Sequence, residues 1–113
     1  MMRALTFDGT LQLRDVPCPV PQAGEALLKV RKAGICNTDL ELTRGYKNFH
    51  GILGHEFVAE VVEGSARFLN KRVVSEINIG CGNCKFCQKG IPSQCRNRSA
   101  IGIIGDKGAF SDY

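Results

Sequence analysis

The first half of the chain alternates apolar and polar residues over short runs, which is the period of a half-buried β-strand. We expect strands over residues 2–7, 10–16, 25–30, 57–62 and 72–75, where valine, leucine and other strand-favouring residues recur. The first two runs meet at Asp8-Gly9, a dipeptide typical of hairpins. Several short strands broken by glycine predict a mainly β fold, either a barrel or a sandwich.

Two short helices interrupt this pattern. The first is expected to start at Asn37 or Thr38, both good N-caps, and to stop before Gly45. The second is expected over residues 85–89, ending at Gly90. Residues 108–113 are typical of the beginning of another strand, so we interpret the sequence as truncated within a longer domain.

The length and composition of the chain limit the kinds of protein it can be. With 113 residues, the chain is one domain or part of one. It has no apolar run long enough to cross a membrane, and the N-terminal MMRALTFDG lacks a signal-peptide core, which favours a cytoplasmic location. The formal net charge is +4.

Part of the positive charge surrounds a group of cysteines. The basic residues there are Lys85, Lys89, Arg96 and Arg98. Basic zinc loops often bind nucleic acid, but only Phe86 is interleaved here, so a platform for stacking bases is missing. We therefore expect a solvated basic surface and no nucleic-acid partner.

Four cysteines within fifteen residues are the most informative feature of the sequence. They are Cys81, Cys84, Cys87 and Cys95, in the run CGNCKFCQKGIPSQC. The spacing C-x2-C-x2-C-x7-C places four soft sulfur ligands on a short loop that can wrap around one ion. A closed shell of four sulfurs is typical of structural zinc.

Other readings of the four cysteines are weaker. A bacterial iron–sulfur run has a three-residue gap before its last cysteine and a proline after it, whereas here the gap is seven residues and Arg96 follows. Disulfides would suit a small secreted domain, but the N-terminus of this chain lacks a signal-peptide core. A redox pair can arise from any C-x-x-C, but three cysteines at three-residue spacing, closed by a fourth, favour a metal.

Two smaller motifs stand apart from the loop. They are Gly34-Ile35-Cys36-Asn37-Thr38-Asp39 and Gly54-His55-Glu56. Cysteine and histidine are zinc ligands, but a single cysteine is more often part of the core, and a single histidine more often a hydrogen-bonded partner. Spacing alone makes Cys36 and His55 a weak candidate site.

Together the three motifs resemble the zinc-dependent medium-chain alcohol dehydrogenases. The resemblance rests on GICNTD, on GHE about twenty residues later and on the cysteine loop, and extends to MRALTF, KRVV and GAFSDY. It implies a partly open β-barrel similar to the chaperonin GroES, with short helices and a zinc-binding lobe over residues 78–98. Residues 1–113 would be a catalytic-domain fragment that lacks the nucleotide-binding Rossmann domain.

The resemblance also implies roles for individual residues. Cys36 and His55 match two ligands of a catalytic zinc, and Glu56 matches an acidic residue that approaches the metal or acts from beside it. Thr38 matches the hydroxyl that passes a proton from the alcohol, and Asp39 the carboxylate that orients the histidine. The four cysteines of the loop match the structural zinc site. Cys18 matches no family feature.

The implied reaction is hydride transfer between NAD or NADP and a small alcohol, polyol or sugar. The cofactor would bind through the missing domain: Gly102, Gly105 and Gly108 are spaced by threes but lack the helix that a dinucleotide fingerprint requires. The third catalytic zinc ligand would also lie elsewhere, so we expect the fragment alone to be inactive. The full-length protein is expected to be a homo-oligomer.

One residue leaves the substrate class open, and two alternative functions remain. Glu41 occupies a position where relatives often carry histidine, which resembles the sugar-dehydrogenase branch, although a solvated helix residue explains it equally well. A zinc-stapled β-barrel that binds a partner without catalysis is the main alternative function. A GroES-like co-chaperone is the weaker one, because it has no reason to carry GHE or the cysteine loop.

Overall fold

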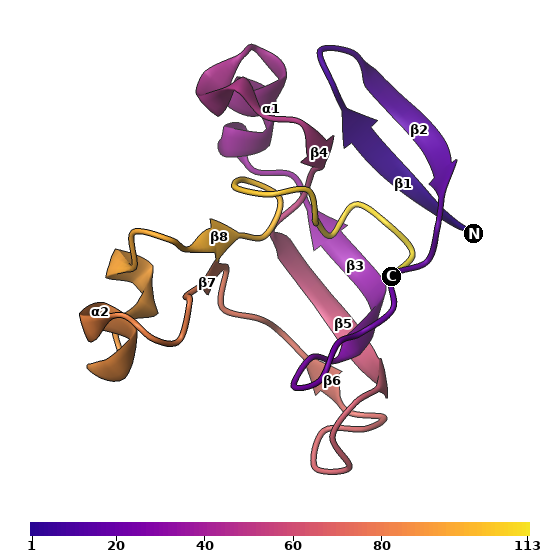
Figure 1. The fold of residues 1–113 in the computed structure, drawn as a ribbon. Coiled ribbons are helices and arrows are strands. Elements are labelled where there is room, and N and C mark those ends of the chain that lie inside the picture. The colour runs from indigo at the N-terminus through magenta and orange to yellow at the C-terminus, as the bar shows by residue number, and fades with distance from the viewer.

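Three small antiparallel sheets form the frame of the molecule, which a computed structural model describes over residues 1–113 (Figure 1). Their strand orders are β2-β1-β4, β3-β5-β6 and β7-β8. The strands are β1 (Met2–Phe7), β2 (Leu11–Val16), β3 (Leu27–Gly34), β4 (Gly51–Ile52), β5 (Glu56–Glu63), β6 (Arg72–Val73), β7 (Asn78–Ile79) and β8 (Ser99–Ala100). The helices are α1 (Asn37–Thr43) and α2 (Lys85–Gln88), with 3₁₀ turns at Tyr46–Asn48 and Pro92–Gln94.

The predicted hairpin at the N-terminus is confirmed. Strands β1 and β2 pair from Met2 with Val16 to Phe7 with Leu11. Gly9 makes the turn with a φ of +97°, a conformation that glycine adopts without strain. β1 alternates buried and exposed side chains, whereas β2 is an exposed edge.

The second sheet brings the two smaller motifs together. Strands β3 and β5 pair along their length, and the last residue of β3, Gly34, lies opposite the first residue of β5, Glu56. Because Cys36 follows β3 closely and His55 precedes β5, both residues lie at the same end of the sheet. β3 begins later and runs further than the predicted strand 25–30, because its polar second half pairs with β5 despite being exposed.

The predicted final strand is wrong. Residues 108–113 form only an isolated bridge to β1, at Ser111. The N–H of Asp112 donates to the Arg3 carbonyl of β1 (3.0 Å), while its carbonyl accepts from Val30 of β3 (3.0 Å). The segment therefore divides its backbone bonds between two sheets, so no continuous ladder forms with either.

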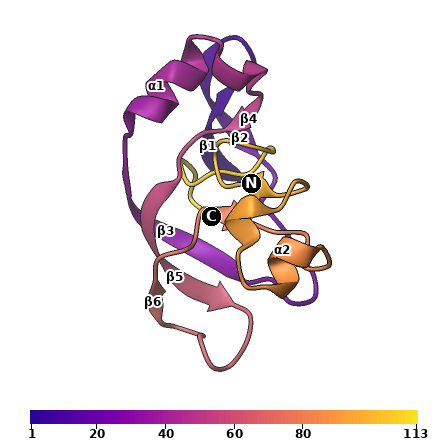
Figure 2. The same ribbon diagram turned by 90° about the vertical axis from the view of Figure 1, so that its left-hand side faces the viewer.

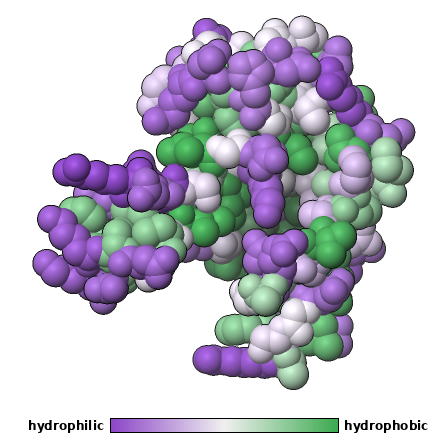
Figure 3. All heavy atoms as spheres, viewed as in Figure 1, coloured by the Kyte–Doolittle hydropathy of each residue, from purple (hydrophilic) through white to green (hydrophobic).

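The three sheets leave the barrel partly open. This agrees with the partly open barrel that the resemblance implies. A hollow of about 390 Å³ lies between β3, the extended segment 17–21 and the segment 106–109, and most of its lining is apolar. Figure 3 shows hydrophobic surface, in green, between the protruding lobe and the rest of the molecule. Lys107 and Glu25 both line the hollow and form an exposed ion pair (3.7 Å).

One cluster of buried hydrophobic residues lies under α1. It consists of Phe7, Leu42, Phe49 and Leu53, with Ile103 and Phe110 packed against it. Leu42 is fully buried, so the inner face of α1 is fixed by hydrophobic packing. Figure 2 shows α1 at one end of the molecule and the loop between β5 and β6 at the other.

Helix α1 begins at Asn37, one of the two predicted starts, but the predicted N-cap is wrong. Its N-cap is Cys36, not Asn37 or Thr38. The Asp39 carboxylate accepts a hydrogen bond from the Cys36 N–H (2.9 Å), which makes Cys36 the N-cap. Neither α1 nor α2 is long and apolar enough to cross a membrane.

Candidate metal centres

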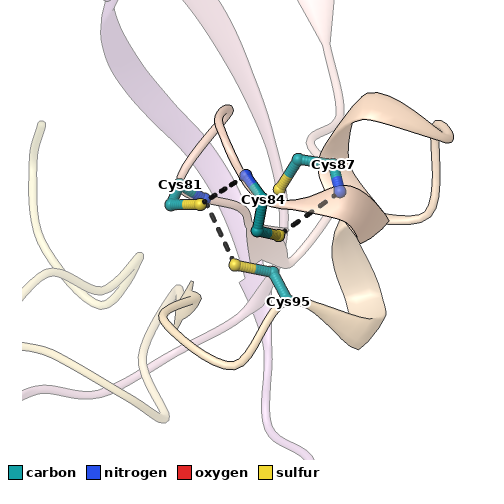
Figure 4. A group of neighbouring side chains, drawn as sticks. All are labelled: Cys81, Cys84, Cys87 and Cys95. Carbon is teal, nitrogen blue, oxygen red and sulfur yellow. Dashed lines mark hydrogen bonds between the residues drawn. The ribbon is translucent and has the colours of Figure 1, made fainter.

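The four cysteines of the loop converge on one point of the lobe (Figure 4). Their Sγ atoms all lie within 4.8 Å of one another, and all four are free thiols. A tetrahedron with zinc–sulfur bonds of about 2.3 Å has edges of about 3.8 Å. The spacing of the sulfurs thus fits a single tetrahedral ion.

Backbone N–H groups point at these sulfurs. Cys81 Sγ accepts from the N–H groups of Asn83 (3.5 Å) and Cys84 (3.4 Å). Cys84 is the N-cap of α2, and its Sγ accepts from the Cys87 N–H (3.5 Å). Cys95 Sγ accepts from the Cys81 N–H (3.4 Å). Such bonds favour thiolates, the form in which cysteine binds a metal.

The protonation of the thiols follows from these contacts. The N–H groups of Asn83 and Cys84 lower the pKa of Cys81 to about 6, and the Cys87 N–H lowers the pKa of Cys84. The Gly82 N–H acts in the same direction on Cys87, but burial and the neighbouring thiols together raise its pKa to about 11. Without a metal the cluster therefore holds both thiolate and thiol groups.

The base of the lobe is fixed by strands β7 and β8. The Arg98 guanidinium donates to Asn78 Oδ1 (3.2 Å) and to the Cys95 carbonyl (3.4 Å). Cys95 is fully buried. The other basic side chains of the lobe, Lys85, Lys89 and Arg96, are exposed and form no ion pair.

The second cluster consists of Cys36, His55 and Glu56. One ligand atom of each lies within 4.8 Å of the others. Cys36 is half-buried, His55 is buried and Glu56 is exposed, so the cluster opens to the surface. Three ligands with an open side are the arrangement of a catalytic zinc site, in contrast to the closed four-sulfur shell of the lobe.

Asp39 connects two members of this cluster. Its Oδ2 accepts from the Cys36 N–H (2.9 Å), and its Oδ1 lies 3.3 Å from His55 Nδ1. Both side chains are buried, and neither Asp39 Oδ1 nor His55 Nδ1 has another hydrogen-bond partner. With Nδ1 facing the carboxylate, the other ring nitrogen of His55 is left to bind a metal.

Two further candidate residues lie on α1, beside the open cluster, and one lies outside both clusters. Thr38 is half-buried in the first turn of α1, next to Asp39. Glu41 pairs with Arg44 (2.9 Å) on the outer side of the same helix. Cys18 is exposed in the extended segment after β2, outside both clusters.

Sequence reasoning missed the support beneath His55. The buried Gly54 packs against the loop of residues 102–110, whose three glycines resemble an incomplete cofactor fingerprint in the sequence. The glycine spacing was the available signal, but it does not reveal which distant backbone the loop contacts.

Comparisons with known proteins identify the family of this chain. Residues 22–113 match the family described as the alcohol dehydrogenase GroES-like domain. L-threonine 3-dehydrogenase of Streptomyces avermitilis is 39% identical over 114 residues, covering 91% of this chain and 33% of the relative. Scyllo-inosose 3-dehydrogenase of Thermotoga maritima is 32% identical over 124 residues, covering 91% and 31%.

A solved structure extends the match to the fold. A protein from Sinorhizobium meliloti, described as a zinc-binding dehydrogenase bound to NADP, superposes with a TM-score of 0.85 at 37% identity. The match covers 100% of this chain and 35% of that protein. The chain thus spans about a third of the length of the proteins it matches. By sequence and by fold, the chain belongs to the alcohol dehydrogenase GroES-like domain family.

Proposed function

We propose that the chain is the N-terminal catalytic part of a zinc-dependent dehydrogenase. The enzyme would transfer a hydride between NAD(P) and a small alcohol, polyol or sugar. The observation that carries the proposal is the pair of ligand clusters, one closed and one open, within this family's domain. A binding module would need only the closed cluster.

The two clusters have different tasks in this proposal. Cys81, Cys84, Cys87 and Cys95 hold a structural zinc that keeps the irregular lobe folded. Cys36, His55 and Glu56 hold the catalytic zinc, with a further ligand from outside these residues. When bound, that ion supplies Lewis acidity toward the substrate oxygen.

The neighbouring side chains prepare the open cluster. Asp39 fixes the tautomer and direction of His55 by facing its Nδ1 atom. The Thr38 hydroxyl, two residues after Cys36, carries the substrate proton away from the site. Both roles rely on the first turn of α1, which the fully buried Leu42 holds against the core.

The cofactor and substrate are assigned at the level of class. The NADP bound by the Sinorhizobium meliloti protein supports a nicotinamide cofactor held by a domain beyond these 113 residues. The relatives named for threonine and scyllo-inosose support a hydroxyl-bearing substrate. The Glu41–Arg44 pair supports a solvated helix role for Glu41, so Glu41 adds nothing to the case for a sugar.

We also propose that the full-length protein is a cytoplasmic homo-oligomer. A reducing compartment keeps the five cysteines of the two clusters free of disulfides and available for metal binding. Size-exclusion chromatography with light scattering on the full-length protein tests the oligomeric state.

The coding sequence downstream of Tyr113 tests the functional proposal. We expect it to encode a βαβ unit with G-x-G-x-x-G, followed by activity of the whole enzyme on alcohols or polyols with NAD(P). The purified 113-residue chain should show no such activity. A stop codon directly after Tyr113, or cofactor-dependent oxidation by the 113-residue chain, would contradict the proposal.

A further inference from the structure

The backbone before His55 is in direct contact with a distant loop. Gly54 and Gly102 are both buried. A Cβ atom built on Gly102 would lie 2.2 Å from the Gly54 carbonyl oxygen and 2.7 Å from its nitrogen. Because such distances are far below van der Waals contact, only glycine at position 102 lets the two backbones approach this closely.

A second contact encloses Gly54 further. A Cβ atom on Gly54 would meet the ring of Phe110 at 2.6 Å and the Phe110 nitrogen at 2.7 Å. Gly54 also has a φ of +102°, which disfavours any other residue. The turn that presents His55 is therefore enclosed by Gly102 and Phe110.

Gly108 allows a third close approach. A Cβ atom there would lie 2.0 Å from the Ile52 carbonyl oxygen and 2.4 Å from that of Leu53. The residues that follow Gly108 then bind the same strand end: Ala109 donates to the Gly54 carbonyl (2.9 Å) and Phe110 to that of Leu53 (2.8 Å). The loop thus grips residues 52–54 by both packing and hydrogen bonds.

The loop is organised for this contact and not for a phosphate group. The Gly102 N–H donates to the Lys107 carbonyl (2.6 Å), so it is used inside the loop. No helix follows the glycines, whereas phosphate-binding glycine loops open onto a helix N-terminus. The glycines at positions 102 and 108 therefore have a structural explanation that the sequence does not reveal.

We propose that Gly102 and Gly108 are positioning residues for His55, acting through the backbone of residues 52–54. They determine where the imidazole stands relative to Cys36 and Glu56, and hence how strongly the open cluster binds a metal. This inference rests on the metal site of the proposed function. It assigns the task of placing the histidine to a loop that contributes no ligand.

Cobalt(II) titration of the 113-residue chain tests the proposal, because thiolate–cobalt sites absorb visible light and the two clusters differ in sulfur content. The variant is Gly102→Ala. The matched control is Gly105→Ala, in the same loop. Both glycines have positive φ (+67° and +110°), but a Cβ on Gly105 meets only Ser99 at 3.9 Å. The two variants share backbone strain and differ in the clash with Gly54.

We expect wild-type chain to bind two cobalt ions, the tighter at the four cysteines. Gly102→Ala should keep the tighter site and weaken the other by about tenfold or more, the effect typical of disturbed ligand support. Gly105→Ala should change that weaker affinity by no more than about twofold. Gly108→Ala, which has no positive-φ strain, should behave like Gly102→Ala.

The contrary outcomes are distinct. Unchanged weaker-site affinity in Gly102→Ala would overturn the positioning role while leaving the proposed function intact. Loss of both sites, or failure of Gly102→Ala to fold, would also overturn it, because the glycine would then support the whole domain. A wild-type chain that binds a single cobalt ion would contradict the proposed function itself, and the positioning role with it.

Discussion

At the scale of single residues, Asp39 contacts two of the three members of the open cluster. One carboxylate in the first turn of α1 accepts the Cys36 N–H and faces His55 Nδ1. It therefore fixes the backbone of one candidate ligand and the ring of another. A negative side chain is also favourable at the N-terminus of a helix.

Replacing this carboxylate should weaken the open cluster alone. Asp39→Asn keeps an oxygen that can accept from Cys36 but loses the charge that faces His55. We expect metal affinity at that cluster to fall by about 10–100-fold, measured by isothermal titration. Glu41→Gln removes an exposed carboxylate from the same helix and serves as the control. Equal affinities for both variants would contradict the role of Asp39.

The cysteines of the lobe should differ in reactivity once the metal is removed. The pKa of Cys81 is lowered to about 6 and that of Cys87 is raised to about 11. At pH 7 Cys81 is then largely thiolate and Cys87 thiol, and only the thiolate reacts with iodoacetamide. Peptide mass spectrometry should find Cys81 alkylated first, with its rate falling as the pH drops through about 6. Faster labelling of Cys87 would contradict this order.

Residue identities could be foreseen better than residue contacts. Motif order singled out both clusters, and the structure brings each set of side chains together. The bond from the Cys36 N–H to Asp39 could not be foreseen, because asparagine and threonine are better N-caps than cysteine. The contact of Gly102 with Gly54 joins residues almost fifty positions apart, which no local pattern encodes.

At the scale of elements, long strands were easier to predict than short ones, although β3 was predicted too early and too short. β1, β2 and β5 are long enough to show alternation, and their predicted positions are confirmed within one residue at each end. β4, β7 and β8 have two residues each, which is too short for any period to appear. Strand 72–75 was predicted too long: only Arg72–Val73 pairs, and Val74 is exposed.

Helix α1 offers a matched test of its packing. Leu42 is fully buried in the core, while Leu40 on the same helix is 46% exposed. Leu42→Ala should lower the free energy of unfolding by about 2–5 kcal/mol, as other buried leucine truncations do. Leu40→Ala should cost less than about 1 kcal/mol. Urea denaturation of the zinc-loaded chain measures the free energy of unfolding of both variants. Similar losses would contradict the claim that Leu42, and not Leu40, faces the core.

At the scale of the whole molecule, few residues are buried and the charge is unevenly placed. Only 15 of 113 residues are buried, so the core is small for the chain length. Four of the fifteen basic residues lie between residues 77 and 105, where no acidic residue occurs. The other eleven basic residues equal the acidic residues in number. The lobe therefore carries the net charge of +4.

This charge suits a metal-bound lobe. Four thiolates and one Zn²⁺ together contribute a charge of about −2. The basic side chains around the loop offset this charge, and hydrophilic surface, in purple, rims the lobe (Figure 3). The metal also supplies stability that a small core lacks, because binding energy at a structural zinc site is folding energy. The lobe is thus best explained as a staple beside the open cluster that we propose to be catalytic.

Zinc stoichiometry tests the central claim, that the chain builds two metal sites of different kinds. Purified chain reconstituted with zinc should hold two ions by elemental analysis and keep one after brief treatment with a mild chelator. Cys36→Ser should hold one ion before and after the same treatment. Two ions in Cys36→Ser, or a single ion in the wild-type chain, would contradict the claim.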